Sequence, residues 1–68
     1  MTNILEFRAA MIRAGYDQKR LAKELNLSEN ALSRKITNQN EFRVSEVLSI
    51  QKIFELNDFQ RDAIFFNA

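Results

Sequence analysis

The 68-residue sequence contains no cysteine, histidine, proline or tryptophan, and only one glycine. Without cysteine the chain forms no disulfide and no thiolate metal site, which suits a reducing compartment such as the cytoplasm. Without histidine it lacks the commonest general base and metal ligand. No apolar run approaches the ~20 residues of a membrane span. We therefore expect no enzyme, cofactor, metal site, small-molecule ligand or membrane association.

The scarcity of proline and glycine, together with abundant Leu, Ala, Glu, Lys, Arg and Gln, favours an all-α fold. The chain has the length of one domain, and neither a repeat nor a low-complexity linker divides residues 1–68. Chains this short bury only about 60% of their unfolded surface, so we expect modest stability.

Hydrophobic spacing and capping residues predict five helices around one core. The first covers 4–14 with Thr2 or Asn3 as its cap, and Gly15 ends it. Two short helices lie within 17–38. The fourth covers 44–54, capped by Arg43 with Glu46 reaching back, or alternatively by Ser45, and the fifth covers 58–66, capped by Asn57 with Gln60.

The apolar positions predict which helical faces are buried. In 4–14 the core stripe is Ile4, Phe7, Met11 and Ala14. A second line in that helix, Leu5, Ala9 and Ile12, is interpreted as part of a wide buried face, with a partner-binding face as the alternative. The remaining core positions are expected at Phe42, at Val44, Val47, Leu48, Ile50 and Phe54, and at Phe59, Ala63 and Phe66. Gln51 is expected to bond a loop carbonyl.

Residues 17–38 carry the most specific pattern. Asp17 is a good helix cap, and Leu21, Ala22 and Leu25 form one apolar stripe. Asn26 tolerates the left-handed conformation that ends a helix, and Ser28 caps a second helix. That helix turns Ala31, Leu32, Ile36 and the stem of Lys35 inward and keeps a polar outer face.

This pattern resembles the Cro/repressor-type helix-turn-helix of phage and bacterial regulators, through Gln18, Leu21, Ala22, Leu27, Ser28, Leu32, Ser33, Arg34 and Asn38. With the flanking apolar residues, nearly the whole chain resembles small phage Cro-like repressors and modulators of repression, or antirepressors. The resemblance implies a five-helix lambda-repressor-like domain in the cytoplasm of a bacterial host, at its nucleoid. The implied function is transcription regulation by binding double-stranded operator DNA through helix 28–37.

The resemblance and the hydrogen-bonding chemistry together assign two sets of DNA contacts. Base contacts are expected from Ser28, Glu29, Asn30, Ser33 and Arg34. Backbone contacts are expected from Gln18, Lys19, Lys35, Thr37, Asn38 and Arg43. The charge distribution agrees, because residues 1–43 hold eight cations and five anions, whereas residues 44–68 hold two cations and four anions.

A protein-binding role is the alternative function. The net charge is only +1, Glu29 would meet repulsion from phosphates, and apolar residues are available for a partner. An antirepressor of this kind would act by binding a phage repressor protein. For either function the candidate interface residues are Leu5, Ile12, Ile64, Phe65 and Phe66, the last three on the helix expected to form a homodimer.

Overall fold

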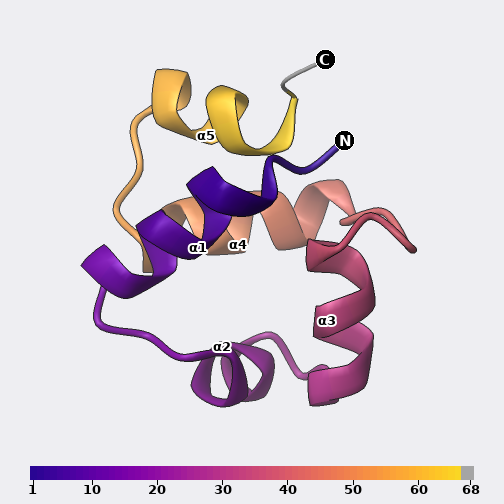
Figure 1. Cartoon of the computed structure of the whole chain (residues 1–68). Helices are drawn as coiled ribbons and strands as arrows, with labels where there is room; N and C mark the ends of the chain where they lie inside the picture. The colour runs from indigo at the N-terminus through magenta and orange to yellow at the C-terminus, as the bar shows by residue number, and fades with distance from the viewer. Residues whose placement is uncertain (67–68) are drawn as a thin grey trace.

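The fold is all-helical, as predicted (Figure 1). The computed structural model describes residues 1–66, so the last two residues of the predicted 1–68 domain lie outside the described part. Its helices are α1 (Ile4–Arg13), α2 (Gln18–Glu24), α3 (Glu29–Ile36), α4 (Val44–Ile53) and α5 (Asp58–Phe65). Within residues 1–66 there is no strand, and no helix is long and apolar enough to cross a bilayer.

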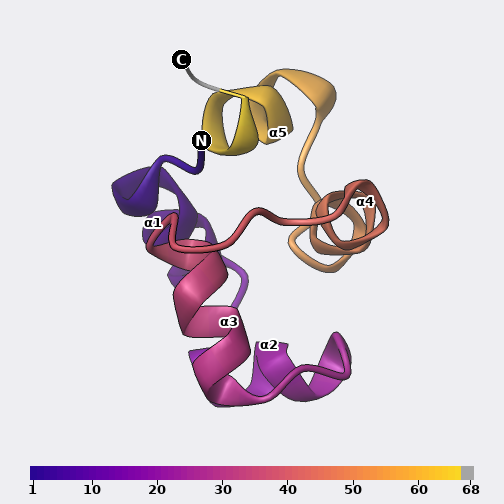
Figure 2. The ribbon, with the colours of Figure 1, turned by 90° about the vertical axis from the view of Figure 1, so that its right-hand side faces the viewer.

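The five helices are arranged so that α2 and α3 form one end of the molecule and α5 the other (Figures 1 and 2). The two end units lie on either side of α1 and α4, and α5 contacts both of these helices. A backbone bond ties the start of the chain to α5, because the Asn3 N–H donates to the Ile64 carbonyl at 2.7 Å. The start of the chain is therefore fixed to the end of the molecule that α5 forms.

The helices begin where the sequence predicts. The side-chain oxygens of Asn3, Asp17, Ser28 and Asn57 each accept a backbone N–H from the first turn. At α4 the Glu46 carboxylate accepts the N–H of Arg43 at 2.8 Å. Of the alternatives left open, Asn3 rather than Thr2 caps α1, and Arg43 rather than Ser45 precedes α4.

Four helices end on a residue with left-handed backbone. Gly15, Asn26 and Asn38 have φ of 76°, 57° and 68°, as their residue types favour, and the fourth is Glu55 at 54°. After each, the next residue's N–H bonds back to the helix; for example, that of Leu27 donates to the Ala22 carbonyl at 2.9 Å. This is the Schellman arrangement, which satisfies carbonyls that the helix end leaves unpaired.

Among residues 1–66, Glu55 is the one left-handed position whose residue type is unfavourable. Replacing Glu55 with glycine removes the contact between Cβ and the following carbonyl, which stabilises the folded state. Glycine also gives the unfolded chain more conformational freedom, and this offsets part of the gain in stability. We expect Glu55→Gly to raise the free energy of unfolding by about 0.5–1 kcal/mol. Urea unfolding measures the change, and the matched Glu41→Gly variant in an exposed loop should give no gain. A destabilised Glu55→Gly protein would contradict the assignment.

The core is centred on Phe7, whose side chain is fully buried. Its ring contacts those of Phe42, Phe54 and Phe65, with centroids 5.7–6.0 Å apart. The other buried apolar residues are Ala10, Leu21, Ala22, Leu32, Ile36, Val47, Ile50 and Ile64. The predictions for Phe7 and Phe42 are thus confirmed, and residues from all five helices share one core.

The predicted faces of α5 are reversed. Ile64 and Phe65 are only 2% and 5% exposed, whereas Phe59 is 82% exposed and Phe66 61%. Both stripes have helical spacing, and the bond from Asn3 together with the ring contact between Phe65 and Phe42 turns the Ile64–Phe65 side inward. Neither Ile64 nor Phe65 therefore offers surface to a partner, and the prediction that they form a dimer contact is wrong.

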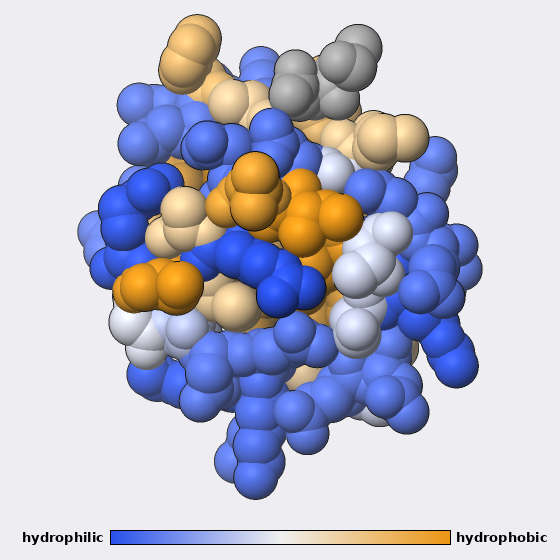
Figure 3. Space-filling view, viewed as in Figure 1, coloured by the Kyte–Doolittle hydropathy of each residue, from blue (hydrophilic) through white to orange (hydrophobic). Residues whose placement is uncertain are grey.

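The prediction that the second apolar line of α1 is buried is also wrong, since Leu5 is 80% exposed and Ile12 is 73% exposed. The same holds on α4 for Val44 and Leu48. Figure 3 shows orange hydrophobic atoms on the surface where α1 crosses the face, interrupted by blue hydrophilic atoms. The partner-binding alternative for Leu5 and Ile12 thus stays open.

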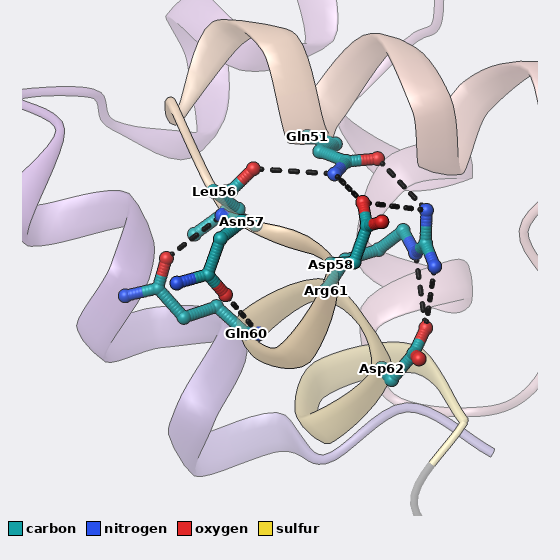
Figure 4. Close-up of polar contacts among 7 residues, drawn as sticks. All are labelled: Gln51, Leu56, Asn57, Asp58, Gln60, Arg61 and Asp62. Atoms are coloured by element: carbon teal, nitrogen blue, oxygen red, sulfur yellow. Dashed lines mark hydrogen bonds and ion pairs between the residues drawn. The ribbon is translucent and has the colours of Figure 1, made fainter.

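Gln51 links α4 to α5 (Figure 4). Its Nε2 donates to the Leu56 carbonyl at 3.2 Å, which confirms the predicted loop bond, and to Asp58 Oδ1 at 2.9 Å. Its Oε1 accepts from Arg61 Nη1 at 3.2 Å. A polar residue on the inner side of α4 is therefore fully engaged in joining the last two helices.

Candidate nucleic-acid interface

The α2–α3 unit is built by a tight turn and a small buried contact. The left-handed Asn26 stops α2, and two residues later the Ser28 hydroxyl accepts the Ala31 N–H at 3.0 Å and starts α3. Leu21 and Leu32 are fully buried, one on each helix. The turn and these buried residues fix the direction of α3 relative to α2.

Ala22 is only 2% exposed, so its methyl group is packed inside the core beside the turn between α2 and α3. Enlarging it to leucine forces the packed helices apart, and we expect Ala22→Leu to lower the free energy of unfolding by ~1–3 kcal/mol. A thermal melt measures this, with Ala9→Leu on the outer side of α1 as the control. Equal melting temperatures for Ala22→Leu and wild type would show that Ala22 is not at a tight contact.

The outer face of α3 carries most of the predicted base-contacting side chains. Glu29, Asn30 and Arg34 are exposed, and Ser33 is half-buried. Asn30 and Arg34 are four residues apart and so lie one above the other on the helix. Ser28 is exposed as well, but its oxygen serves as the helix cap. The face is a row of donors and acceptors backed by the buried Leu32 and Ile36.

Lys35 does not lie free on this surface. Its Nζ donates to both oxygens of Glu46, at 2.6 and 2.7 Å, and the two side chains are only 12% and 13% exposed. The ammonium ties α3 to α4, so we withdraw Lys35 from the predicted phosphate contacts. The sequence placed its stem inward correctly but gave no sign that Glu46 would receive the charge.

The Lys35–Glu46 pair makes stability depend on pH. Burial alone would raise the pKa of Glu46, but hydrogen bonds from Lys35 and the Arg43 N–H, with the charges of both residues, hold it below its usual value near 4.5. A carboxyl whose pKa is lowered on folding contributes stability above its unfolded pKa and loses it as the pH falls through the folded pKa. The pair therefore stabilises the fold at neutral pH.

We expect Glu46→Gln to lower the free energy of unfolding at pH 7 by about 1–3 kcal/mol, because Lys35 is left with a neutral partner. At pH 3, below the ordinary Glu46 pKa, the difference from wild type should shrink. Urea unfolding at the two pH values measures this, with exposed Glu24→Gln as control. A difference independent of pH would contradict the role of the carboxylate.

Asn38 is engaged by the N-terminal segment. Its Oδ1 accepts the Thr2 N–H at 2.7 Å, and its Nδ2 donates to the Thr2 carbonyl at 3.0 Å. Thr37 donates its hydroxyl to the Ser33 carbonyl at 2.8 Å. Both predicted backbone contacts thus make hydrogen bonds within the fold: the Asn38 side chain joins the end of α3 to the start of the chain, whereas the Thr37 hydroxyl bonds back to α3 itself.

The other predicted backbone contacts are accessible. Lys19 and Arg43 are exposed, and Gln18 donates a long bond of 3.5 Å to the Glu29 carbonyl. Sequence reasoning left out Arg20 and Lys23, two further exposed cations of α2. Arg20 lies over the Tyr16 ring, 4.4 Å from its centroid. The helical spacing of Lys19, Arg20 and Lys23 opposite Leu21 would have placed them all on the outer face of α2.

Searches against protein-family models, curated proteins and solved structures give no match. Among residues 1–66 no group of three or more acidic side chains is placed to hold a metal ion.

Proposed function

We propose that the protein is a sequence-specific, double-stranded-DNA-binding transcriptional regulator with a lambda-repressor-like helix-turn-helix, formed by α2 and α3. A repressor of a phage lysis–lysogeny switch, acting on operator DNA, is the specific role that the resemblance implies. The observation that carries the proposal is the exposed row on α3, where Asn30 and Arg34 project from a helix at the edge of the fold. An isolated helix edge of this kind fits the major groove.

The side chains on α3 have the chemistry to read bases. Arg34 is suited to a bidentate bond with guanine O6 and N7, and Asn30 to one with adenine N6 and N7. Glu29 accepts from a cytosine N4 amine. Its negative charge raises the cost of approach to any other sequence, so Glu29 contributes to discrimination rather than to general affinity.

Contacts to the DNA backbone come from the surroundings of α3. Lys19 and Arg43 are exposed members of the predicted set and Gln18 is half-buried, and Lys23 adds another exposed cation from α2. Without Lys35, residues 1–43 keep seven cations against five anions. The electrostatic contribution is therefore small, and we expect weak binding to random DNA.

A mobility-shift titration of the chain alone tests the proposal. We expect binding to the preferred duplex to weaken with salt at a slope of roughly −3 on logarithmic axes, as for three or four phosphate contacts. The control duplex has scrambled sequence, and Lys52→Ala provides a protein control in the acidic half of the chain. Equal affinity for both duplexes would contradict sequence-specific recognition.

A second candidate function, that of an antirepressor, is favoured by the exposed apolar residues Leu5, Ile12 and Phe59. Such a protein binds a phage repressor, and its own DNA affinity is incidental. Tight binding to a repressor without any DNA shift would favour this function over the first.

A further inference from the structure

Residues 1–3 connect the end of α3 to α5, and we call them the strap. Asn38, which follows the last turn of α3, binds Thr2 through both groups of its side-chain amide, at 2.7 and 3.0 Å. The next residue, Asn3, donates its N–H to the Ile64 carbonyl in the last turn of α5 at 2.7 Å. The start of the chain thus lies between the loop after α3 and the end of α5 (Figures 1 and 2).

Asn38 is suited to this position in two ways. Its backbone is left-handed, with φ of 68°, which asparagine and glycine adopt more readily than other residues. Its side chain both donates and accepts, so it pairs with the N–H and the carbonyl of Thr2 at once. Thr2 is only 8% exposed, and buried backbone groups that are left unpaired destabilise a fold. Glycine at this position would supply the backbone conformation without either bond.

The strap is only partly packed against the core. It borders a cavity of about 190 Å³, whose wall also includes Phe42, Val47 and Phe65. Side chains therefore do not fill the space between the strap and this part of the core, and Met1 is 84% exposed. Because a segment with few packed contacts opens more readily than the whole fold, the bonds from Asn38 and Asn3 are what keep the strap closed.

The bonds that close the last turn of α3 lie directly beside Asn38. The N–H groups of Gln39 and Asn40 both donate to the Arg34 carbonyl, at 2.8 and 3.1 Å. If Asn38 moves away from the strap, the backbone that carries these two donors moves with it. The body of α3 is held separately, because Leu32 is fully buried.

We propose that the strap is a lock on the last turn of α3, with Asn38 as its positioning residue. When the lock is closed, the end of α3 is fixed to α5. When it opens, four N–H groups lose their partners together while the rest of the fold stays intact. These four, which we call the lock amides, belong to Thr2, Asn3, Gln39 and Asn40.

Only the consequence of the lock for DNA binding rests on the proposed function. A bidentate contact from Arg34 to guanine requires that the backbone of Arg34 be held in one position, and the lock amides of Gln39 and Asn40 bond to that backbone. Contacts to phosphates position the protein without reading sequence. Opening the lock should therefore reduce the preference for one sequence more than it reduces the general affinity for DNA.

Amide hydrogen exchange of the free protein, followed by NMR, tests the lock without DNA. Asn38→Gly removes the side-chain amide but keeps a residue that tolerates the left-handed backbone. We expect the exchange rates of all four lock amides to rise together by about tenfold, as for the loss of two hydrogen bonds. Thr2→Pro removes the N–H that Asn38 accepts and leaves the Asn38 side chain intact, so it should raise the rates of the three remaining lock amides. Circular dichroism confirms that each variant is folded.

Two control variants separate the lock from other effects. Asn26→Gly makes the same substitution at a second left-handed asparagine, in the turn between α2 and α3, and should leave the lock amides unchanged. Ile50→Val weakens the buried core, so it should speed the exchange of amides that open only with the whole fold, but not that of the lock amides. If the lock amides respond to Ile50→Val as core amides do, or if Asn38→Gly speeds only Thr2 and Asn3, the proposal is overturned.

The same variants distinguish positioning from direct contact in DNA binding. Asn38→Gly and Thr2→Pro should both lower the ratio of affinities for the preferred and the random duplex by about tenfold, part of the discrimination that Arg34 provides. Asn26→Gly should leave this ratio unchanged. Equal losses on both duplexes from Asn38→Gly, with none from Thr2→Pro, would make Asn38 a phosphate contact and contradict its positioning role. If wild type shows no sequence preference, the proposed function fails, and the exchange rates still decide whether the strap locks α3.

Discussion

Phe7→Ala should leave the protein largely unfolded at 37 °C. Phe7 is fully buried and its ring contacts three other phenylalanine rings. Removing a core phenylalanine costs about 3–5 kcal/mol. A domain of this length has a total stability of roughly 3–10 kcal/mol, so most or all of it is lost.

Circular dichroism and urea unfolding measure the effect. Phe59→Ala is the matched control, because Phe59 is 82% exposed and its loss should change the free energy of unfolding by less than about 0.5 kcal/mol. Phe7→Leu, which keeps most of the buried volume, should fall between the two. Similar losses for Phe7→Ala and Phe59→Ala would contradict the burial of these rings and the orientation of α5.

Arg34→Ala should abolish most of the sequence preference in DNA binding. Losing a bidentate guanine contact costs about 1–3 kcal/mol on the preferred duplex. Arg34 also carries charge, so a smaller loss on random DNA follows from counterion release. Gln18→Ala should behave differently, because Gln18 is uncharged and is predicted to contact the DNA backbone. This substitution should weaken binding to both duplexes about equally.

The measurement is a pair of affinities, for the preferred and the random duplex, for each variant at one salt concentration. Lys52→Ala controls for the loss of one positive charge at an exposed site on α4. If Arg34→Ala lowers both affinities by the same factor, Arg34 is a phosphate contact. Glu29 and Ser33 would then be the side chains of α3 that contact the bases.

The local features of this fold are predictable because short-range chemistry decides them. The caps Asn3, Asp17, Ser28 and Asn57 have side chains that accept backbone N–H groups close in sequence. The left-handed Gly15, Asn26 and Asn38 follow from residue type in the same way. Within residues 1–66, Glu55 is the one left-handed residue whose type has no such preference.

The buried faces of α1 and α5 are less predictable, because each helix is apolar on two sides. Helical spacing identifies Phe59, Ala63 and Phe66 as a stripe but does not say which way the stripe points. That choice depends on contacts distant in sequence, such as the bond from Asn3 to Ile64 and the packing of Phe65 on Phe42. For this reason two interface predictions on α5 failed, while Phe66 remains accessible.

The candidate DNA surface shows the same division. The outward direction of Asn30 and Arg34 follows from their spacing against Leu32 and Ile36 within α3. The engagement of Lys35 by Glu46, eleven residues away, depends on how α4 packs beside α3. A charged residue on a helix can therefore be predicted to be exposed only at a position that no other helix covers.

If α3 reads a DNA sequence, as proposed, selection from a random duplex library will recover that sequence. The purified chain is bound to the library at low salt, and the retained duplexes are amplified and sequenced over several rounds. We predict enrichment of a short motif containing guanine, lost when Arg34→Ala is used in place of wild type. Retained duplexes without a common motif, or the same motif from both proteins, would contradict the claim.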